Sequence, residues 1–134
     1  MKTKLQNIAC IIDDDKMFTY LVSKQIRLQN LCDTIISFGD GEEALRYLRP
    51  IIETPDTLPS VILLDINMPV LDGWQFLDEF TKFAITSKVK VYIVSSSIDR
   101  ADQMKAASYK DVSNFYAKPI TNEQLVEMLK DFNH

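Results

Sequence analysis

The chain has 134 residues, of which 46% are hydrophobic and 25% are charged, and its formal net charge is −4. This length and composition are typical of one globular domain with one core, so we treat residues 1–134 as a single domain. The negative charge argues against a direct nucleic-acid binder, because no excess of basic side chains is available to displace counterions from phosphates. No run approaches the ~18 apolar residues of a membrane span, and no signal-peptide core is present, so we expect a cytoplasmic protein without membrane contact.

Short apolar runs alternate with helical patterns along the whole sequence. The predicted strands are residues 8–12, 34–38, 61–64, 88–95 and 114–117. The predicted helices are residues 16–29, 42–49, 73–84 and 99–109, followed by a last helix that Thr121 or Asn122 caps. Regular alternation of this kind predicts an α/β domain with a parallel sheet and right-handed crossovers. We expect a doubly wound, flavodoxin-like fold with strand order 2-1-3-4-5 and five flanking helices.

Two segments carry weaker patterns. Residues 50–59 hold three prolines and are predicted to form a loop. The helix at residues 99–109 is only weakly amphipathic. Its predicted apolar face consists mostly of Ala101, Met104, Ala106 and Ala107.

The most informative stretch is the apolar run from Val61 to Leu64, which ends in the carboxylate of Asp65. An uninterrupted apolar run of this kind predicts a strand covered on both faces. Ligands of such sheets collect outside the carboxyl ends of the strands, which is where Asp65 lies. A carboxylate buried there is costly unless it is paired, bound to a metal or used in chemistry.

Other predicted strands also end in polar groups. Asp13 and Asp14 follow the first strand, Ser95 ends the fourth, and Lys118 follows the fifth. In a parallel sheet these residues share one edge with Asp65, which brings three carboxylates together. Like charges raise one another's pKa, so we expect Mg2+, which prefers oxygen ligands, and the Lys118 ammonium to neutralise the cluster. A carboxylate nucleophile surrounded by a metal, a lysine and a hydroxyl suits phosphoryl transfer.

These residues carry a resemblance to a known family. The pair Asp13-Asp14, the segment from Asp65 through Asn67 to Gly73, Ser95 and the dipeptide Lys118-Pro119 resemble the receiver (CheY-like) domain of two-component response regulators. The resemblance covers nearly the whole chain. Each motif alone is common, but all four follow their own predicted strands in the right order, which is a specific signal.

The resemblance implies a phosphoacceptor and a metal site. Asp65 matches the aspartate that accepts the phosphoryl group, and it also contributes to the metal site. Asp14 matches the main Mg2+ carboxylate, and Asp13 matches an acidic neighbour that acts largely through a bound water. Asn67 matches the position whose backbone carbonyl completes the metal sphere.

The resemblance also implies a role for a lysine and for two residues that move when the protein is phosphorylated. Lys118 matches the lysine that pairs with the acceptor and then with a phosphoryl oxygen, and the Lys118–Pro119 peptide is expected to be cis. Ser95 matches the hydroxyl that moves to bind the phosphoryl group, in place of the commoner threonine; Ser96 and Ser97 compete for this position. Phe115 matches the aromatic side chain that turns inward when the hydroxyl moves.

The implied function is a signalling switch. A histidine kinase or a histidine phosphotransfer protein donates a phosphoryl group to Asp65, and the face made of the fourth helix, the fifth strand and the fifth helix rearranges. We expect a monomer or weak homodimer, because this face is a common dimer surface in relatives. The protein is expected to phosphorylate and dephosphorylate itself rather than act as a multiple-turnover enzyme. Residues 50–59 form a longer connection than usual and are a candidate contact for a specific partner.

Two other functions share part of this pattern. A small-molecule phosphatase that forms an aspartyl phosphate also uses an aspartate, Mg2+ and a lysine, but such enzymes commonly carry a second aspartate at the position of Asn67 and a lid domain. A flavodoxin-like cofactor binder needs a phosphate loop after the first strand. The carboxylates of Asp13, Asp14 and Asp15 would repel a phosphate there.

Overall fold

The computed structural model describes residues 7–83, 89–96 and 99–129. Five parallel strands form one sheet in the order β2-β1-β3-β4-β5, as predicted. The strands are β1 (Ile8–Ile12), β2 (Thr34–Phe38), β3 (Val61–Leu64), β4 (Lys90–Ser95) and β5 (Val112–Ala117). The helices are α1 (Lys16–Leu28), α2 (Gly41–Leu48), α3 (Gly73–Phe80), α4 (Arg100–Ala107) and α5 (Asn122–Leu129).

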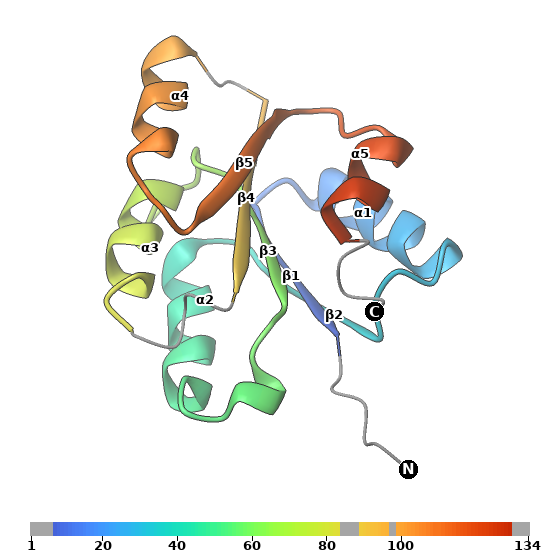
Figure 1. Cartoon of the computed structure of the whole chain (residues 1–134), viewed down its shortest axis with the longest axis horizontal. Coiled ribbons are helices and arrows are strands. Elements are labelled where there is room, and N and C mark those ends of the chain that lie inside the picture. The colour runs from blue at the N-terminus through green and yellow to red at the C-terminus, as the bar shows by residue number, and fades with distance from the viewer. Residues whose placement is uncertain (1–6, 84–88, 97–98, 130–134) are drawn as a thin grey trace.

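Helices cover both faces of the sheet. Figure 1 shows α1 and α5 on one side and α2, α3 and α4 on the other. The core is accordingly divided in two, because alternate side chains of each strand point to opposite faces. In β1, Cys10 and Ile12 belong to the core beneath α2 and α3, whereas Ala9 and Ile11 belong to the core beneath α1 and α5. Every residue of β1 and β3 is buried, which explains why these strands are continuous apolar runs.

The central strands end in register at one edge of the sheet. Ile12 of β1 lies opposite Leu64 of β3, and the ladder continues past both strands. The backbone N–H of Asp65 donates to the carbonyl of Ile12, and the N–H of Asp13 donates to the carbonyl of Phe38, both at 2.9 Å. Asp13 and Asp65 are therefore fixed side by side where their strands end.

Most of the helices begin at an oxygen-bearing side chain that accepts hydrogen bonds from the first backbone N–H groups. Asp15, Asp40, Asp72 and Asp99 cap α1, α2, α3 and α4. Thr121 rather than Asn122 caps α5, since its hydroxyl accepts from the N–H of Gln124 at 3.1 Å. Short polar caps of this kind let each helix start within a few residues of a strand end.

Several element bounds differ from the sequence prediction. α3 ends at Phe80, four residues early, and β5 begins at Val112, two residues early. Residues 49–59 include two short 3-10 helices, Arg49–Ile51 and Pro55–Thr57, where a loop was predicted. Ala84, Lys88 and Ser97, which belong to the predicted helix, strand and switch positions, lie outside the described residues.

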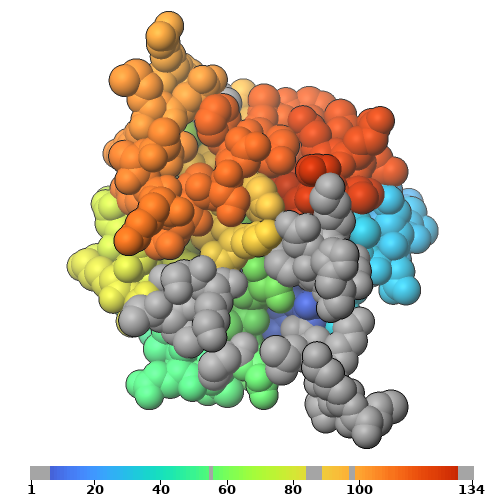
Figure 2. All heavy atoms as spheres, in the orientation of Figure 1, coloured from blue at the N-terminus to red at the C-terminus, as the bar shows by residue number. Residues whose placement is uncertain are grey.

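The predicted apolar face of α4 is wrong. Only Ala106 is buried, and Met104 is 69% exposed. The reason is tertiary: α4 contacts the core at its C-terminal end, through Ala106 and Tyr109, and the rest of the helix stands clear of the sheet. Figure 2 shows α4 projecting at one corner of the molecule. Among the described residues, no helix has the length and apolar character needed to cross a membrane.

Candidate functional site

Lys118 is the centre of a cluster of charges at the carboxyl ends of the strands. Its Nζ lies 2.7 Å from Oδ2 of Asp13, 3.6 Å from Oδ2 of Asp65 and 3.9 Å from Oδ2 of Asp15. The Lys118 side chain is only 11% exposed, and the carboxylates of Asp13 and Asp65 are buried. The Lys118–Pro119 peptide is cis, as expected from the resemblance.

Burial and the neighbouring groups both shift the pKa of Asp13. Burial disfavours its charged form and raises the pKa of Asp13 from 3.8 to about 6, while hydrogen bonds from Lys118 and from the Asp15 backbone lower that pKa and the nearby charge of Asp65 raises it further. One ammonium therefore does not fully compensate the buried carboxylates. The site favours additional positive charge.

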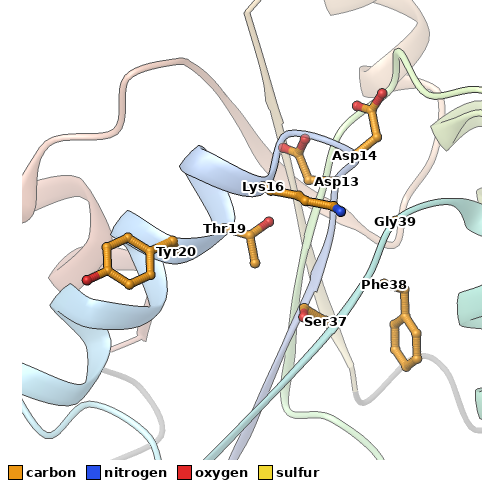
Figure 3. A pocket seen from close by; sticks show the side chains of 8 residues that line it. All are labelled: Asp13, Asp14, Lys16, Thr19, Tyr20, Ser37, Phe38 and Gly39. Carbon is orange, nitrogen blue, oxygen red and sulfur yellow. The ribbon is translucent and has the colours of Figure 1, made fainter.

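The predicted metal ligands come together. Asp13, Asp14 and Asp65 each present a carboxylate oxygen, and these three oxygens lie within 4.8 Å of one another. Oxygens on opposite sides of a Mg2+ ion are about 4.2 Å apart, so the cluster matches this ion after a small contraction. Asp14 is exposed, and Figure 3 shows Asp13 and Asp14 at the end of β1 beside a pocket of about 410 Å3. The donor set and its access to solvent fit a hydrated Mg2+ ion.

Asn67 connects the predicted acceptor, Asp65, to the predicted switch residue, Ser95. Its backbone N–H donates to Oδ1 of Asp65 at 3.0 Å, and its side-chain Nδ2 donates to Oγ of Ser95 at 3.1 Å. Ser95 is fully buried, and its carbonyl accepts from the N–H of Lys118 at 3.0 Å. Ser96, the alternative in the described part of the chain, is exposed. The structure thus places Ser95 beside the site, as predicted.

Gly73 fixes the backbone around Asp65. A Cβ atom at Gly73 would lie 2.5 Å from the carbonyl oxygen of Asp65 and 2.7 Å from Cα of Ile66, closer than real contacts allow. Asp72 and Gln75 form a reciprocal capping box that anchors the start of α3 here. Gly73 was not among the predicted site residues, but it holds the loop after Asp65 against α3.

Phe115 lies on β5 opposite Ile93 and packs against the core on the α2–α3–α4 side. Its side chain is half-buried, and its register places it two residues before the partner of Ser95, which is Ala117. Phe115 thus lies on the strand that pairs with the strand of Ser95. Its role in switching stays a prediction.

Sequence reasoning missed two neighbours of Lys118. These are Asp15, the residue before α1, and Phe18, in the first turn of α1. Both reach the ammonium: Oδ2 of Asp15 is 3.9 Å and the Phe18 ring centroid 4.3 Å from Nζ of Lys118. No sequence pattern marks these contacts, since they depend on how α1 and β5 pack.

The arrangement defines a class of protein before any comparison. It is a doubly wound parallel domain in which three clustered carboxylates and a largely buried lysine lie at the strand ends. The sequence profile of the response regulator receiver domain matches residues 9–130. The chain therefore belongs to the response regulator receiver family.

Individual relatives agree with this assignment. The chain is 31% identical over 120 residues to a probable chemotaxis protein CheY of Rhizobium etli, covering 90% of this chain and 88% of that protein. It is 26% identical over 123 residues to the sensor histidine kinase CheAY of Helicobacter pylori, covering 92% of this chain but only 14% of that protein. The crystal structure of a two-component response regulator from Cytophaga hutchinsonii superposes with a TM-score of 0.85 at 30% identity, covering 97% and 98% of the two chains.

Proposed function

We propose that this receiver accepts a phosphoryl group on Asp65 and acts as a switch in a phosphorelay. The observation that carries the proposal is the environment of the Asp65 carboxylate. It is buried, 3.6 Å from the Lys118 ammonium, and within 4.8 Å of two further carboxylates. A carboxylate there is held in place as a nucleophile, and its surroundings bind the added negative charge.

The transfer step uses residues that the structure brings together. An Asp65 carboxylate oxygen forms a bond to phosphorus while the phosphorus–nitrogen bond of a phosphohistidine breaks, and the electron pair of that bond returns to the imidazole. Lys118 then pairs with a phosphoryl oxygen. Asp14, Asp65 and the backbone carbonyl of Asn67 would hold Mg2+ directly, and Asp13 would hold it through a water. Bound Mg2+ supplies positive charge to the phosphoryl oxygens.

The switching step follows from the added charge. A phosphoryl group adds roughly −1.5 to −2 charges and several strong acceptor oxygens. We propose that the Ser95 hydroxyl leaves Asn67 for one of these oxygens, and that Phe115 turns inward into the space that the hydroxyl leaves. The surface formed by α4, β5 and α5, which Figure 2 shows from orange to red, then changes its shape for a partner.

The partner that delivers the phosphoryl group must contact the same end of the sheet. Met17, Tyr20, Leu21 and Leu28 are large, exposed and lie along one face of α1. Two of them, Leu21 and Leu28, line a groove of about 460 Å3 between α1 and the start of α5. We propose that a helix of a histidine kinase or histidine phosphotransfer protein packs there. Leu21→Glu should then slow transfer from a phosphorylated partner but leave labelling by acetyl phosphate unchanged.

We further propose that the protein works in the cytoplasm as a stoichiometric switch, as a monomer or weak homodimer. The test of acceptor and stoichiometry is incubation with Mg2+ and acetyl phosphate, followed by intact-protein and peptide mass spectrometry. We expect one adduct of about 80 Da, a single PO3 group, on Asp65, and none on Asp65→Asn. Labelling at another residue, or rapid multiple turnover of the phosphate ester without an adduct, would contradict the proposal. The matched control is Asp56→Asn, which changes an exposed carboxylate away from the site.

A further inference from the structure

We propose that Phe18 is a positioning residue that holds the Lys118 ammonium within reach of the phosphoryl group on Asp65. The inference deepens the proposed function and rests on it. It assigns a role in the transfer step to an apolar side chain of α1.

The contact between the two side chains is direct. Nζ of Lys118 lies over the Phe18 ring, 4.3 Å from the ring centroid. Phe18 is itself 9% exposed and packs in the core with Ile26 and Leu125. Its backbone N–H donates to Oδ1 of Asp15 at 3.1 Å, which fixes the first turn of α1. The ring is therefore a rigid platform beneath the ammonium.

The carboxylates alone do not hold the ammonium on Asp65. Nζ is 2.7 Å from Asp13 but 3.6 Å from Asp65, so its strongest partner is Asp13. Asp15, at 3.9 Å, draws the ammonium toward solvent, because half of its side chain is exposed. The ring supplies a further attraction that does not come from a carboxylate, with its centroid 4.3 Å from Nζ. It thereby limits how far the ammonium moves away from the acceptor.

An aromatic ring suits this task because it attracts a cation through its quadrupole. It offers no lone pair that claims one of the three N–H donors of the ammonium. When Mg2+ engages the acidic cluster, the ammonium can exchange Asp13 for a phosphoryl oxygen while it keeps its contact with the ring. A leucine would fill much of the same volume but would attract no charge.

The test compares Phe18→Leu with Phe18→Tyr, which keeps the ring. Ile26→Val is the matched control, because it trims a buried side chain of the same helix and core. We expect Phe18→Leu to label Asp65 with acetyl phosphate and Mg2+ about tenfold more slowly than wild type, as the loss of a partly desolvated cation–π contact predicts. Phe18→Tyr and Ile26→Val should label at nearly the wild-type rate, with each rate corrected for the folded fraction measured by circular dichroism.

A spectroscopic measurement tests the contact without any reaction. Protons that lie over an aromatic ring are shifted upfield, so the Cε protons of Lys118 should be shifted upfield in wild type and Phe18→Tyr but not in Phe18→Leu. Absence of this shift in wild type, or equal labelling rates of Phe18→Leu and Ile26→Val, would overturn the inference. If wild type itself accepts no phosphoryl group, the proposed function fails instead, and the shift of Lys118 still decides whether the contact exists.

Discussion

The side-chain amide of Asn67 donates a hydrogen bond to the hydroxyl of Ser95, with 3.1 Å between Nδ2 and Oγ. The backbone N–H of the same Asn67 holds the Asp65 carboxylate. One residue thus contacts both the proposed acceptor and the proposed switch hydroxyl. In the proposed function the amide of Asn67 competes with the phosphoryl group for Ser95.

This competition predicts the effect of Asn67→Ala. The substitution removes the amide but keeps the backbone N–H that binds Asp65. A neutral hydrogen bond of this kind contributes about 0.5–1.5 kcal/mol, so its loss should shift the switch severalfold toward the activated arrangement. A titration with beryllofluoride and Mg2+, followed by chemical shifts near Phe115, should reach its midpoint at a lower concentration in Asn67→Ala.

Two serine variants test the same mechanism in the same titration. Ser95→Ala should bind beryllofluoride but lose the response at Phe115, because the moving hydroxyl is gone. Ser96→Ala, which removes an exposed hydroxyl next to it, should respond like wild type. A wild-type response in Ser95→Ala would show that the hydroxyl does not transmit the signal.

A second prediction concerns the backbone around the acceptor. Gly73→Ala places a Cβ atom 2.5 Å from the Asp65 carbonyl oxygen. The atoms that it meets belong to the backbone, so no side-chain rotation can relieve the contact. Overpacking of this kind costs about 1–3 kcal/mol, and here it also displaces the acceptor loop. We expect a lower midpoint of urea unfolding together with slower labelling of Asp65 by acetyl phosphate.

Gly39→Ala provides the matched control, since nothing lies within 4 Å of a Cβ atom at Gly39. Its stability should change by no more than about 0.5 kcal/mol. Equal stability of the two alanine variants would show that the loop before α3 can relax around the added methyl group.

The sequence predicted which charged side chains lie together, because these residues follow strands. Asp13, Asp65 and Lys118 each come directly after an apolar run, and parallel pairing alone brings such positions to one edge of the sheet. The meeting of these side chains is a consequence of that rule, whereas the strand order was expected from the flavodoxin-like fold. They required no knowledge of how the helices pack.

The features that the sequence did not predict depend on packing between elements. No pattern marks the contact of Phe18 with Lys118, because it forms only when the first turn of α1 and the residue after β5 meet in the fold. Met104 looked apolar and buried, but α4 meets the core only near its C-terminal end. A periodic pattern shows which face of a helix is apolar and not how much of that face is covered.

A third prediction follows from the raised pKa of Asp13. The folded protein holds the Asp13 proton up to about pH 6, whereas the unfolded chain releases it near pH 3.8. Between these values the folded state binds more protons, so the contribution of Asp13 to the free energy of unfolding falls as pH rises, by about 3 kcal/mol in total. Comparing urea unfolding of wild type and Asp13→Asn without Mg2+ isolates this contribution.

Added Mg2+ should reverse the trend, because the ion binds the ionised carboxylates and stabilises the folded state where they are charged. The stabilisation by Mg2+ should therefore grow as pH rises through about 6. A wild-type stability that increased relative to Asp13→Asn over the same Mg2+-free range would contradict the assignment of a raised pKa.

The last prediction concerns the link between α3 and α4. The Tyr109 ring stacks on Trp74 with 5.7 Å between centroids, and its hydroxyl donates to Oδ1 of Asp78 at 2.6 Å. Lys105 lies 4.9 Å from the centroid of the Trp74 ring, so both helices contribute to one cluster. Burial and the Asp78 carboxylate raise the pKa of Tyr109 to about 12, which keeps the phenol protonated as a donor.

Tyr109→Phe removes the hydroxyl but keeps the stacked ring, so it should lower the free energy of unfolding by about 1 kcal/mol. Tyr109→Ala should cost about 2 kcal/mol or more, because the stacking and the core contact are lost too. Trp74 is the only tryptophan, so its fluorescence during urea unfolding reports on this cluster directly. Tyr47→Phe, on the exposed ring that contacts Phe38, is the control and should behave like wild type. If Tyr109→Phe also matches wild type, the bond to Asp78 contributes nothing to holding α4 against α3.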